Sequence, residues 1–571
     1  THGSRGPRRL KPWARPGFTM SCLQNCCEQE LDPLDPLDFR TPVTESAETS
    51  AVEFEPELVA NGDGPNGLGT MCSVNMAMSC SEVQEALGEA SFQSHVSDRI
   101  RETDLEILRG ITLRESLCRG ASMWRKNPEH LSVRAREALF QKSQLVKHLD
   151  IFVSHTWASG GWSKALSLLM QSGCGVALIF WFFGIVLAAL LCHADILPMP
   201  LRYAPGTERF SEACPLGPWV MILGTFGTLV GLMLSPYCPR CNPMDMCFID
   251  AACVQQTDET MMKRGIHGIG GFLLVSKELR IIWSPVYLTR LWCVFEIATY
   301  KKLNPDGAVV LAPIFLETVV VLFYASNLLG AVAYLFIRGS GAGSYVAIPA
   351  LLLCCLPYLI TIHYLRKNYV QKHRLFAQFE NFDLDLVECS NESDRNFVHT
   401  AITQLYGSNE GFTSYVKGAL REELLRPIAG SVGPERYALL IESPILSMLL
   451  EFCIALWKGG ALPDVILLYA VSLVLGLLFH HRTAISLAIL LSDHFAEPAC
   501  SSICVDLLQT FLIFLVFLLH VALGTALCQG AFFTNQWLLL PGISILFAVA
   551  HFAVIWLQRK SNSRRLTSTA S

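Results

Sequence analysis

The sequence is poor in charged residues. Only 16% of its 571 residues are Asp, Glu, Lys or Arg, whereas soluble domains usually carry about 25%. Hydrophobic residues make up 51% of the chain and the mean hydropathy is +0.38, which excludes an ordinary soluble protein and indicates a membrane protein. The net charge of -5 provides no basic field, so we expect no nucleic-acid partner.

The sequence also lacks the motifs of several enzyme classes. It contains no phosphate-binding loop, kinase signature, nucleophile elbow or zinc-protease motif. Cys238, Cys241 and Cys247 have zinc-like spacing, but a structural zinc site needs a fourth ligand and no second pair follows. We therefore predict no metal site. Residues 1–20 lack the apolar core of a cleavable signal peptide, and we expect none there.

Long apolar runs predict membrane-spanning helices. Each run approaches the roughly 20 residues that cross a bilayer. The predicted spans are residues 173–192, 216–235, 317–337, 344–364, 438–457, 463–480, 503–527 and 537–557. Lys and Arg cluster after the fourth, sixth and eighth spans, which lie on one side of the membrane in this arrangement. Because such clusters favour the cytoplasm, we expect an integral, multi-pass protein of the lipid bilayer with both termini cytoplasmic.

The segments outside the spans differ in composition. Residues 1–95 are rich in Pro, Gly, Ser and acids and are predicted to be disordered. Residues 96–147 have apolar residues at helical spacing and predict a helical lead-in. Residues 365–437 predict a small cytoplasmic helical unit, and residues 558–571 a basic cytoplasmic tail.

Two blocks with α/β character flank the first membrane hairpin, which covers residues 173–235. The first block, residues 148–170, contains a short apolar run and then a helix, and the second, residues 246–316, alternates strands with helices. This alternation predicts a doubly wound parallel sheet. Because an even number of spans separates the blocks, both emerge on the same side and can complete one sheet.

The order of these elements resembles that of Toll/interleukin-1 receptor (TIR) domains. "DIFVSHTW" is similar to their first strand, "CFID" to the second, "LRIIWSPVYLTRLWCVFEIA" to the third strand and the next helix, and "VVLAPIFL" to the fourth strand. The resemblance implies a TIR-like domain of flavodoxin-like fold in an α-helical membrane protein that signals through self-association. The membrane hairpin inside the domain and the lack of an evident fifth strand depart from the family pattern.

The stretch "RLWCVFEIATY" places Trp292 and Glu296 one helical turn apart. In many TIR domains the glutamate of a W-x-x-x-E helix is essential for cleaving NAD at its N-glycosidic bond, so the resemblance makes Glu296 the candidate catalytic residue. NAD would be a substrate, and no bound cofactor is expected. One carboxylate is enough, because the nicotinamide ring is a pyridinium cation while it is bonded to the ribose and departs as a neutral base. Its departure therefore needs no general acid. The alternative is a surface helix with a solvated carboxylate.

The ligand of such a fold binds outside the carboxyl ends of the strands. Residues that follow the first and third strands reach that edge, and Trp292 precedes Glu296 on the next helix. The predicted ligand-binding residues are Ser154, His155, Thr156, Trp157, Ser284, Pro285 and Trp292. As an alternative, His155 and Trp157 only cap and pack the turn after the first strand.

Two other functions fit the sequence. Some TIR domains are assembly modules without enzymatic activity, so a non-catalytic scaffold is the first alternative. Glu442 and Glu451 lie in the fifth span, where an acid is costly unless it faces a polar cavity or a partner. A channel or transporter with a cytoplasmic regulatory domain is therefore the second alternative. No inverted repeat of transporter type is evident, which favours a hydrogen-bonded Glu451 within a membrane anchor.

Overall fold

The computed structural model describes residues 104–238, 245–341, 346–389, 391–430, 435–498, 500 and 502–567. The segment predicted to be disordered, the first residues of the lead-in, Cys241 and the end of the basic tail lie outside these residues.

A six-stranded sheet of order β2-β1-β6-β3-β7-β8 forms in the described part of the chain. Its parallel strands are β3 (Leu149–Ser154), β6 (Met246–Phe248), β7 (Ser276–Trp283) and β8 (Ala308–Pro313). Numbered along the chain, these four strands lie in the spatial order 2-1-3-4. This is the order of a flavodoxin-like, doubly wound sheet, whose topological switch point lies between β3 and β7.

The sheet joins the two blocks of chain that flank the membrane hairpin. β3 precedes the hairpin, and β6 and β7 follow it, yet β3 lies between them and pairs in parallel with both. In the core, the ring of Phe152 stacks on that of Phe248, with ring centroids 4.5 Å apart. The two blocks therefore form one sheet, as the even number of intervening spans predicted.

Residues 96–147 contribute strands as well as helices. β1 (Arg109–Thr112) pairs antiparallel with β6, and β2 (Gln144–Leu145) pairs antiparallel with β1. Between them lie α2 (Leu113–Arg125), the 3-10 helix η1 (Pro128–His130) and α3 (Val133–Phe140). The lead-in that was expected to be helical therefore also contains two short strands, because β1 pairs with β6, which lies far away in sequence, and β2 pairs with β1.

Helices cover the sheet and connect it to the membrane half. After β6 come α6 (Asp250–Cys253), α7 (Glu259–His267) and α8 (Ile269–Leu274), and after β7 comes α9 (Leu291–Leu303). The predicted cytoplasmic helical unit contains α13 (Glu392–Tyr406), α14 (Asn409–Tyr415) and α15 (Arg421–Gly430). Phe397 and Val398 of α13 are buried in the same core as the sheet residues, so this unit packs on the α/β unit, against α9.

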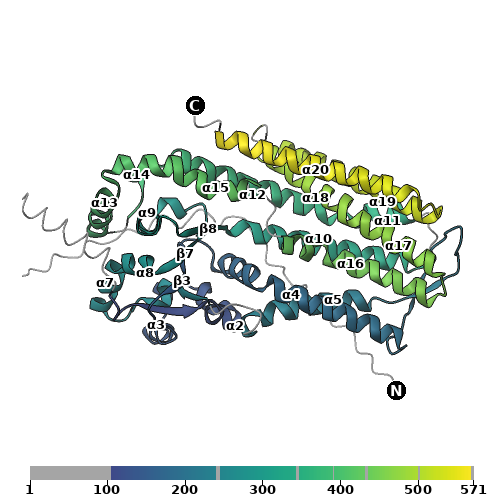
Figure 1. Cartoon of the computed structure of the whole chain (residues 1–571), viewed down its shortest axis with the longest axis horizontal. Helices are drawn as coiled ribbons and strands as arrows, with labels where there is room; N and C mark the ends of the chain where they lie inside the picture. The colour runs from purple at the N-terminus through teal and green to yellow at the C-terminus, as the bar shows by residue number, and fades with distance from the viewer. Residues whose placement is uncertain are drawn as a thin grey trace, which may run out of the picture. The chain divides into compact units, whose positions relative to one another are not determined.

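Six helices of the described chain are long and apolar enough to cross a membrane, as in a multi-pass membrane protein. They are α4 (Gly161–His193), α5 (Trp219–Leu234, extended to Tyr237), α10 (Ile314–Arg338), α16 (Glu435–Lys458), α19 (Ile503–Phe533) and α20 (Leu539–Thr567). In Figure 1, α10 and α16 run side by side away from the strands, and α4 begins beside the sheet and lies against α5.

Two of the eight predicted spans are interrupted. The segment 344–364 divides into α11 (Ala347–Cys354) and α12 (Pro357–Glu380), because Pro357 has no N–H with which to continue the helix. The segment 463–480 comprises α17 (Pro463–Gly476) and a π-helical segment, η7 (Leu477–His481), and leads directly into α18 (Arg482–His494). Neither segment is a regular α-helix of full span length.

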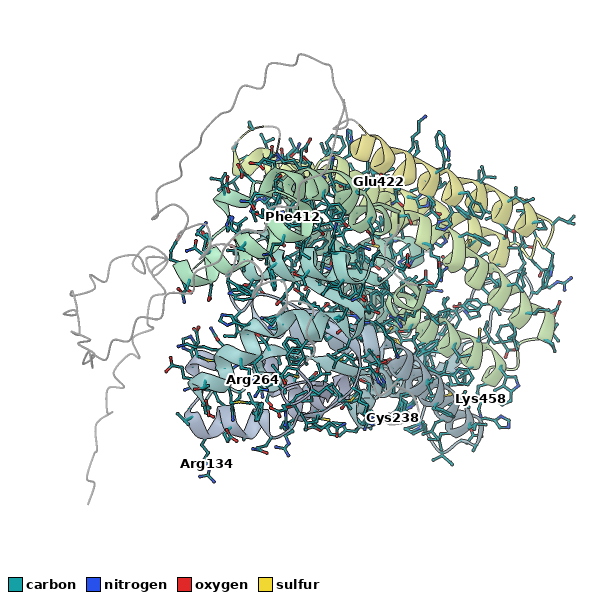
Figure 2. All side chains as sticks on the ribbon, turned by 60° about the vertical axis from the view of Figure 1, so that its left-hand side comes forward. Arg134, Cys238, Arg264, Phe412, Glu422 and Lys458 are labelled. Atoms are coloured by element: carbon teal, nitrogen blue, oxygen red, sulfur yellow. The ribbon has the colours of Figure 1, made fainter. Side chains whose placement is uncertain are left out.

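Figure 2 labels one residue of an ion pair at the end of α16, Lys458, and one residue of an ion pair on the α/β unit, Arg264. Lys458, at the end of α16, forms an ion pair of 2.6 Å with Asp195, in the loop after α4. Arg264 lies on α7 in the α/β unit and pairs with Asp104 at 2.6 Å.

Both acids of the fifth predicted span have structural partners. Glu451 accepts hydrogen bonds from the backbone N–H groups of Val220 and Met221, which satisfies free donors at the N-terminus of α5. Glu442 accepts a hydrogen bond of 2.9 Å from Arg482. These contacts agree with the hydrogen-bonded Glu451 that the sequence favoured.

Candidate functional site

The candidate site lies at the carboxyl edge of the sheet, at its topological switch point. β3 ends at Ser154, β7 ends at Trp283, and α9 returns past this edge. The Ser154 hydroxyl donates a hydrogen bond to the Glu296 carboxylate of α9, and it also shares a hydrogen bond with the Tyr287 hydroxyl. Ser154 and Tyr287 are fully buried, and Glu296 keeps a small exposed surface. Doubly wound sheets bind their ligands at this position.

The Glu296 carboxyl holds its proton unusually strongly. Burial raises the pKa of Glu296 to about 8, because the surrounding protein solvates the carboxylate less well than water does. The hydrogen bond from Ser154 acts in the opposite direction, and the negative charge of Asp250 adds a smaller increase in pKa. Strongly shifted carboxyl groups at such an edge are typical of functional sites.

A second group of side chains surrounds His155. The Trp157 indole N–H donates a hydrogen bond of 2.7 Å to Asp250, the residue that follows β6 and Ile249. The His155 ring lies edge-on to Trp157 and Trp124, with centroids 4.7 and 5.1 Å away. Lys164 of α4 donates to the Thr156 carbonyl at 2.9 Å and lies over the Trp157 ring. These contacts fix the turn after β3, as the packing alternative expected.

One ring nitrogen of His155 has no hydrogen-bond partner among the described residues. Burial lowers the pKa of His155 to about 4, although Asp250 partly offsets this effect, so the imidazole is neutral at pH 7. Its Nε2 atom has no hydrogen-bond partner among the described residues and lies 3.9 Å from an Asp250 carboxylate oxygen. If Nδ1 carries the proton, Nε2 and the carboxylate are neighbouring acceptors, and a donor group of a ligand can satisfy both.

The remaining predicted residues have different surroundings. The Ser284 hydroxyl is buried and has no hydrogen-bond partner within the described ranges, whereas the Pro285 carbonyl accepts a hydrogen bond from Gln378 of α12. Trp292 packs on Phe397 of α13 and donates a hydrogen bond of 3.3 Å to Asp394. Trp292 therefore contacts the helical unit, although it shares α9 with Glu296.

Sequence reasoning missed four residues of this site. They are Lys164, Asp250, Tyr287 and Gln378. Asp250 carried a usable signal, because it is the acid that closes "CFID" at the carboxyl end of a predicted strand. The other three become part of the site only through tertiary contacts.

Fold and site define a class of protein: a multi-pass helical membrane protein with an α/β unit, built on a mixed and mainly parallel sheet, that carries a buried carboxyl at the carboxyl edge of that sheet. No family model matches the chain, and no curated protein or solved structure matches it either. Any function must therefore be argued from the site.

Proposed function

We propose that the α/β unit is a TIR-like domain that cleaves NAD at its N-glycosidic bond through Glu296, within a membrane-anchored protein that signals by self-association. The observation that carries this proposal is the hydrogen bond between Ser154 and Glu296. It holds a carboxyl with a pKa of about 8 at the point where this sheet topology places its ligands.

Glu296 would stabilise positive charge that develops during the reaction. As the bond to nicotinamide lengthens, the ribose acquires oxocarbenium character, which an adjacent carboxylate stabilises in a site with little water. NAD itself favours the required ionisation. Its cationic nicotinamide ring, when bound near Glu296, lowers the pKa of the carboxyl and promotes the carboxylate form.

His155 and Asp250 would orient the substrate. Their facing acceptor atoms, 3.9 Å apart, suit a ligand that has two neighbouring donor hydrogens, such as an amide NH₂ group or two adjacent hydroxyls. The carboxamide of nicotinamide and the ribose hydroxyls supply such donors. Trp157, fixed by Asp250 and Lys164, offers an aromatic face beside them.

The direct test uses the full chain, purified in detergent micelles and incubated with NAD, with nicotinamide measured by liquid chromatography. We expect Glu296→Gln to reduce nicotinamide release by about a hundredfold or more, the usual loss when a group that stabilises the transition state is removed. Glu259→Gln is the matched control, because Glu259 is exposed on α7 and forms a surface ion pair with Lys263. Equal release by the wild type and Glu296→Gln would refute the catalytic assignment.

A non-catalytic TIR-like scaffold is the second candidate. The packing of Trp292 on α13 favours it, since this aromatic residue is turned toward Phe397 and Asp394. A scaffold would release no nicotinamide, but it would still self-associate in a chemical cross-linking assay. A transporter is less well supported, because Glu442 and Glu451 already have structural partners.

The proposed orientation places both termini and the α/β unit in the cytoplasm. Epitope tags added at each end of the chain test it directly. In sealed vesicles whose cytoplasmic face is outward, protease should remove both tags, and protection of either tag would contradict the orientation.

A further inference from the structure

A cavity of about 120 Å³ lies among the helices of the membrane half, away from Glu296. Residues of α10, α11, α12, α16, α17, η7 and α19 line it. Most of the lining is aliphatic or aromatic, as at Met448, Phe517 and Val521. The cavity surface is therefore mainly apolar, and polar side chains such as Asn327, Tyr358 and His481 could fix the orientation of a ligand.

Both interrupted helices reach this cavity. Tyr358, the second residue of α12, lines it just after the break at Pro357. His481, the last residue of the π-helical segment η7, lines it from another side. Broken helices and π-helical turns recur at the binding sites of membrane proteins, since a continuous α-helix would pack without such a space.

A chain of hydrogen bonds leads to His481 and fixes its chemistry. The Asn327 amide N–H donates to the Ile441 carbonyl, so the Asn327 side-chain oxygen is the acceptor for the Tyr358 hydroxyl. Because the Tyr358 proton is used in this way, the phenolic oxygen accepts from His481 Nε2, at 3.3 Å. A neutral imidazole has one N–H. With the proton on Nε2, His481 Nδ1 is an acceptor.

This acceptor has no partner in the part of the chain that the structure describes. His481 is only 5% exposed, and its Nδ1 atom makes no hydrogen bond there. A buried polar atom without a partner is unfavourable, and it lies on a residue that lines an apolar cavity. A ligand that donates one hydrogen bond and is otherwise apolar would satisfy both features.

We propose that this cavity, with its volume of about 120 Å³, binds the hydroxyl end of an apolar molecule, which donates a hydrogen bond to His481 Nδ1. Long-chain alcohols and sterols share this chemistry and dissolve in the bilayer around the helices. The site is separate from the carboxyl edge of the sheet, so the proposal does not depend on NAD cleavage.

The experiment uses the full chain in lipid nanodiscs and two photoreactive probes, a diazirine-bearing long-chain alcohol and a diazirine-bearing sterol. Each probe is paired with its methyl ether, which keeps the shape but cannot donate a hydrogen bond. After irradiation, labelled peptides are identified by mass spectrometry. We expect label on α10, α12, η7 or α19. One of the two hydroxyl probes should label about fivefold more than its ether, the effect of one ordinary hydrogen bond.

Two variants test the residue assignment. His481→Phe should reduce labelling by the hydroxyl probe to the level of its ether, whereas His551→Phe should not. His551 is the matched control, since its Nδ1 atom is also buried without a partner but the residue is not part of the cavity lining. Val521→Phe, which fills the cavity, should reduce labelling by both members of a pair and serves as the second variant if His481→Phe does not fold.

The two sources of ligand are distinguished by which hydroxyl probe labels at the lower concentration. Equal labelling by each hydroxyl probe and its ether would overturn the proposal. Label confined to the outer faces of the helices, or labelling that Val521→Phe leaves unchanged in a folded protein, would overturn it as well.

Discussion

Ser154 and Glu296 form a hydrogen bond between two blocks of chain that a membrane hairpin separates. Ser154 is the last residue of β3, which precedes the hairpin. Glu296 lies on α9, which follows both the hairpin and β7. The candidate site therefore exists only when both blocks meet in one sheet.

Replacement of Ser154 by alanine tests how this bond controls Glu296. Because the hydrogen bond from Ser154 lowers the pKa of Glu296, we expect Ser154→Ala to raise that pKa above its present value of about 8. Nicotinamide release, which requires the carboxylate, should then rise with pH at a more alkaline midpoint. The free energy of unfolding should fall by about 1 kcal/mol. Ser159→Ala, in the following turn, is the control, and an unchanged midpoint in Ser154→Ala would contradict the role of the bond.

The raised pKa of Glu296 predicts a loss of stability at alkaline pH. The folded protein keeps this proton up to about pH 8, whereas the unfolded chain releases it near the model value of 4.5. The stability that this bound proton contributes to the folded state is therefore fully present below pH 4.5 and is lost as the pH rises through 8. Melting temperatures measured from pH 5 to 9 should fall less steeply in Glu296→Gln than in the wild type. Parallel curves would show that folding does not raise the pKa of Glu296.

The lowered pKa of His155 predicts a loss of stability at acid pH. Its pKa falls from 6.5 to about 4 on folding, so the unfolded chain binds a proton that the folded protein excludes. The stability that the neutral imidazole contributes to the folded state is present above pH 6.5 and is lost as the pH falls toward 4. In a plot of melting temperature against pH, His155→Gln should make the acid limb, which is the decrease at low pH, less steep. Asp250→Asn should steepen it, because the Asp250 carboxylate raises the pKa of His155. An acid limb that neither variant alters would contradict the assignment.

The main elements of the α/β unit could be predicted from local sequence. The apolar runs around Phe152 and Ile281 mark β3 and β7, and the alternation with helices implies a parallel sheet. β1 could not be predicted, because it has four residues and pairs with a strand far along the chain. The break between α11 and α12 carried a visible signal in Pro357, inside a segment that hydropathy alone marks as a span.

The site was predictable in part. Glu296 was proposed through the resemblance and Ser154 through its position after the first strand, and the structure brings them into contact. Trp292 was grouped with them by helical spacing, but spacing gives only the face of a helix, and the position of α13 decides what that face contacts. Lys164 was missed because its ammonium group reaches Thr156 and Trp157 through packing that no local pattern records.

The hairpin itself provides the last prediction. A Cβ atom at Gly231 of α5 would lie 2.7 Å from the Phe180 Cβ atom and 2.9 Å from the Val176 carbonyl oxygen, both on α4. Small residues at such positions allow close helix packing in membranes. We expect Gly231→Leu to force the helices apart at a cost of about 1–3 kcal/mol. Hydrogen exchange should then increase at β3 and β6, which lie on either side of the hairpin.

Gly175→Leu, on the same hairpin, is the matched control, because a Cβ atom at Gly175 meets nothing within 4 Å. The two variants add the same side chain to the same pair of helices, so a difference between them reports packing of α4 on α5 rather than hydrophobicity. If β3 and β6 exchange at wild-type rates in a Gly231→Leu protein whose helices have separated, the sheet holds its two blocks together without the hairpin. If both the exchange at these strands and nicotinamide release change together, the membrane half sets the geometry of the Ser154–Glu296 pair.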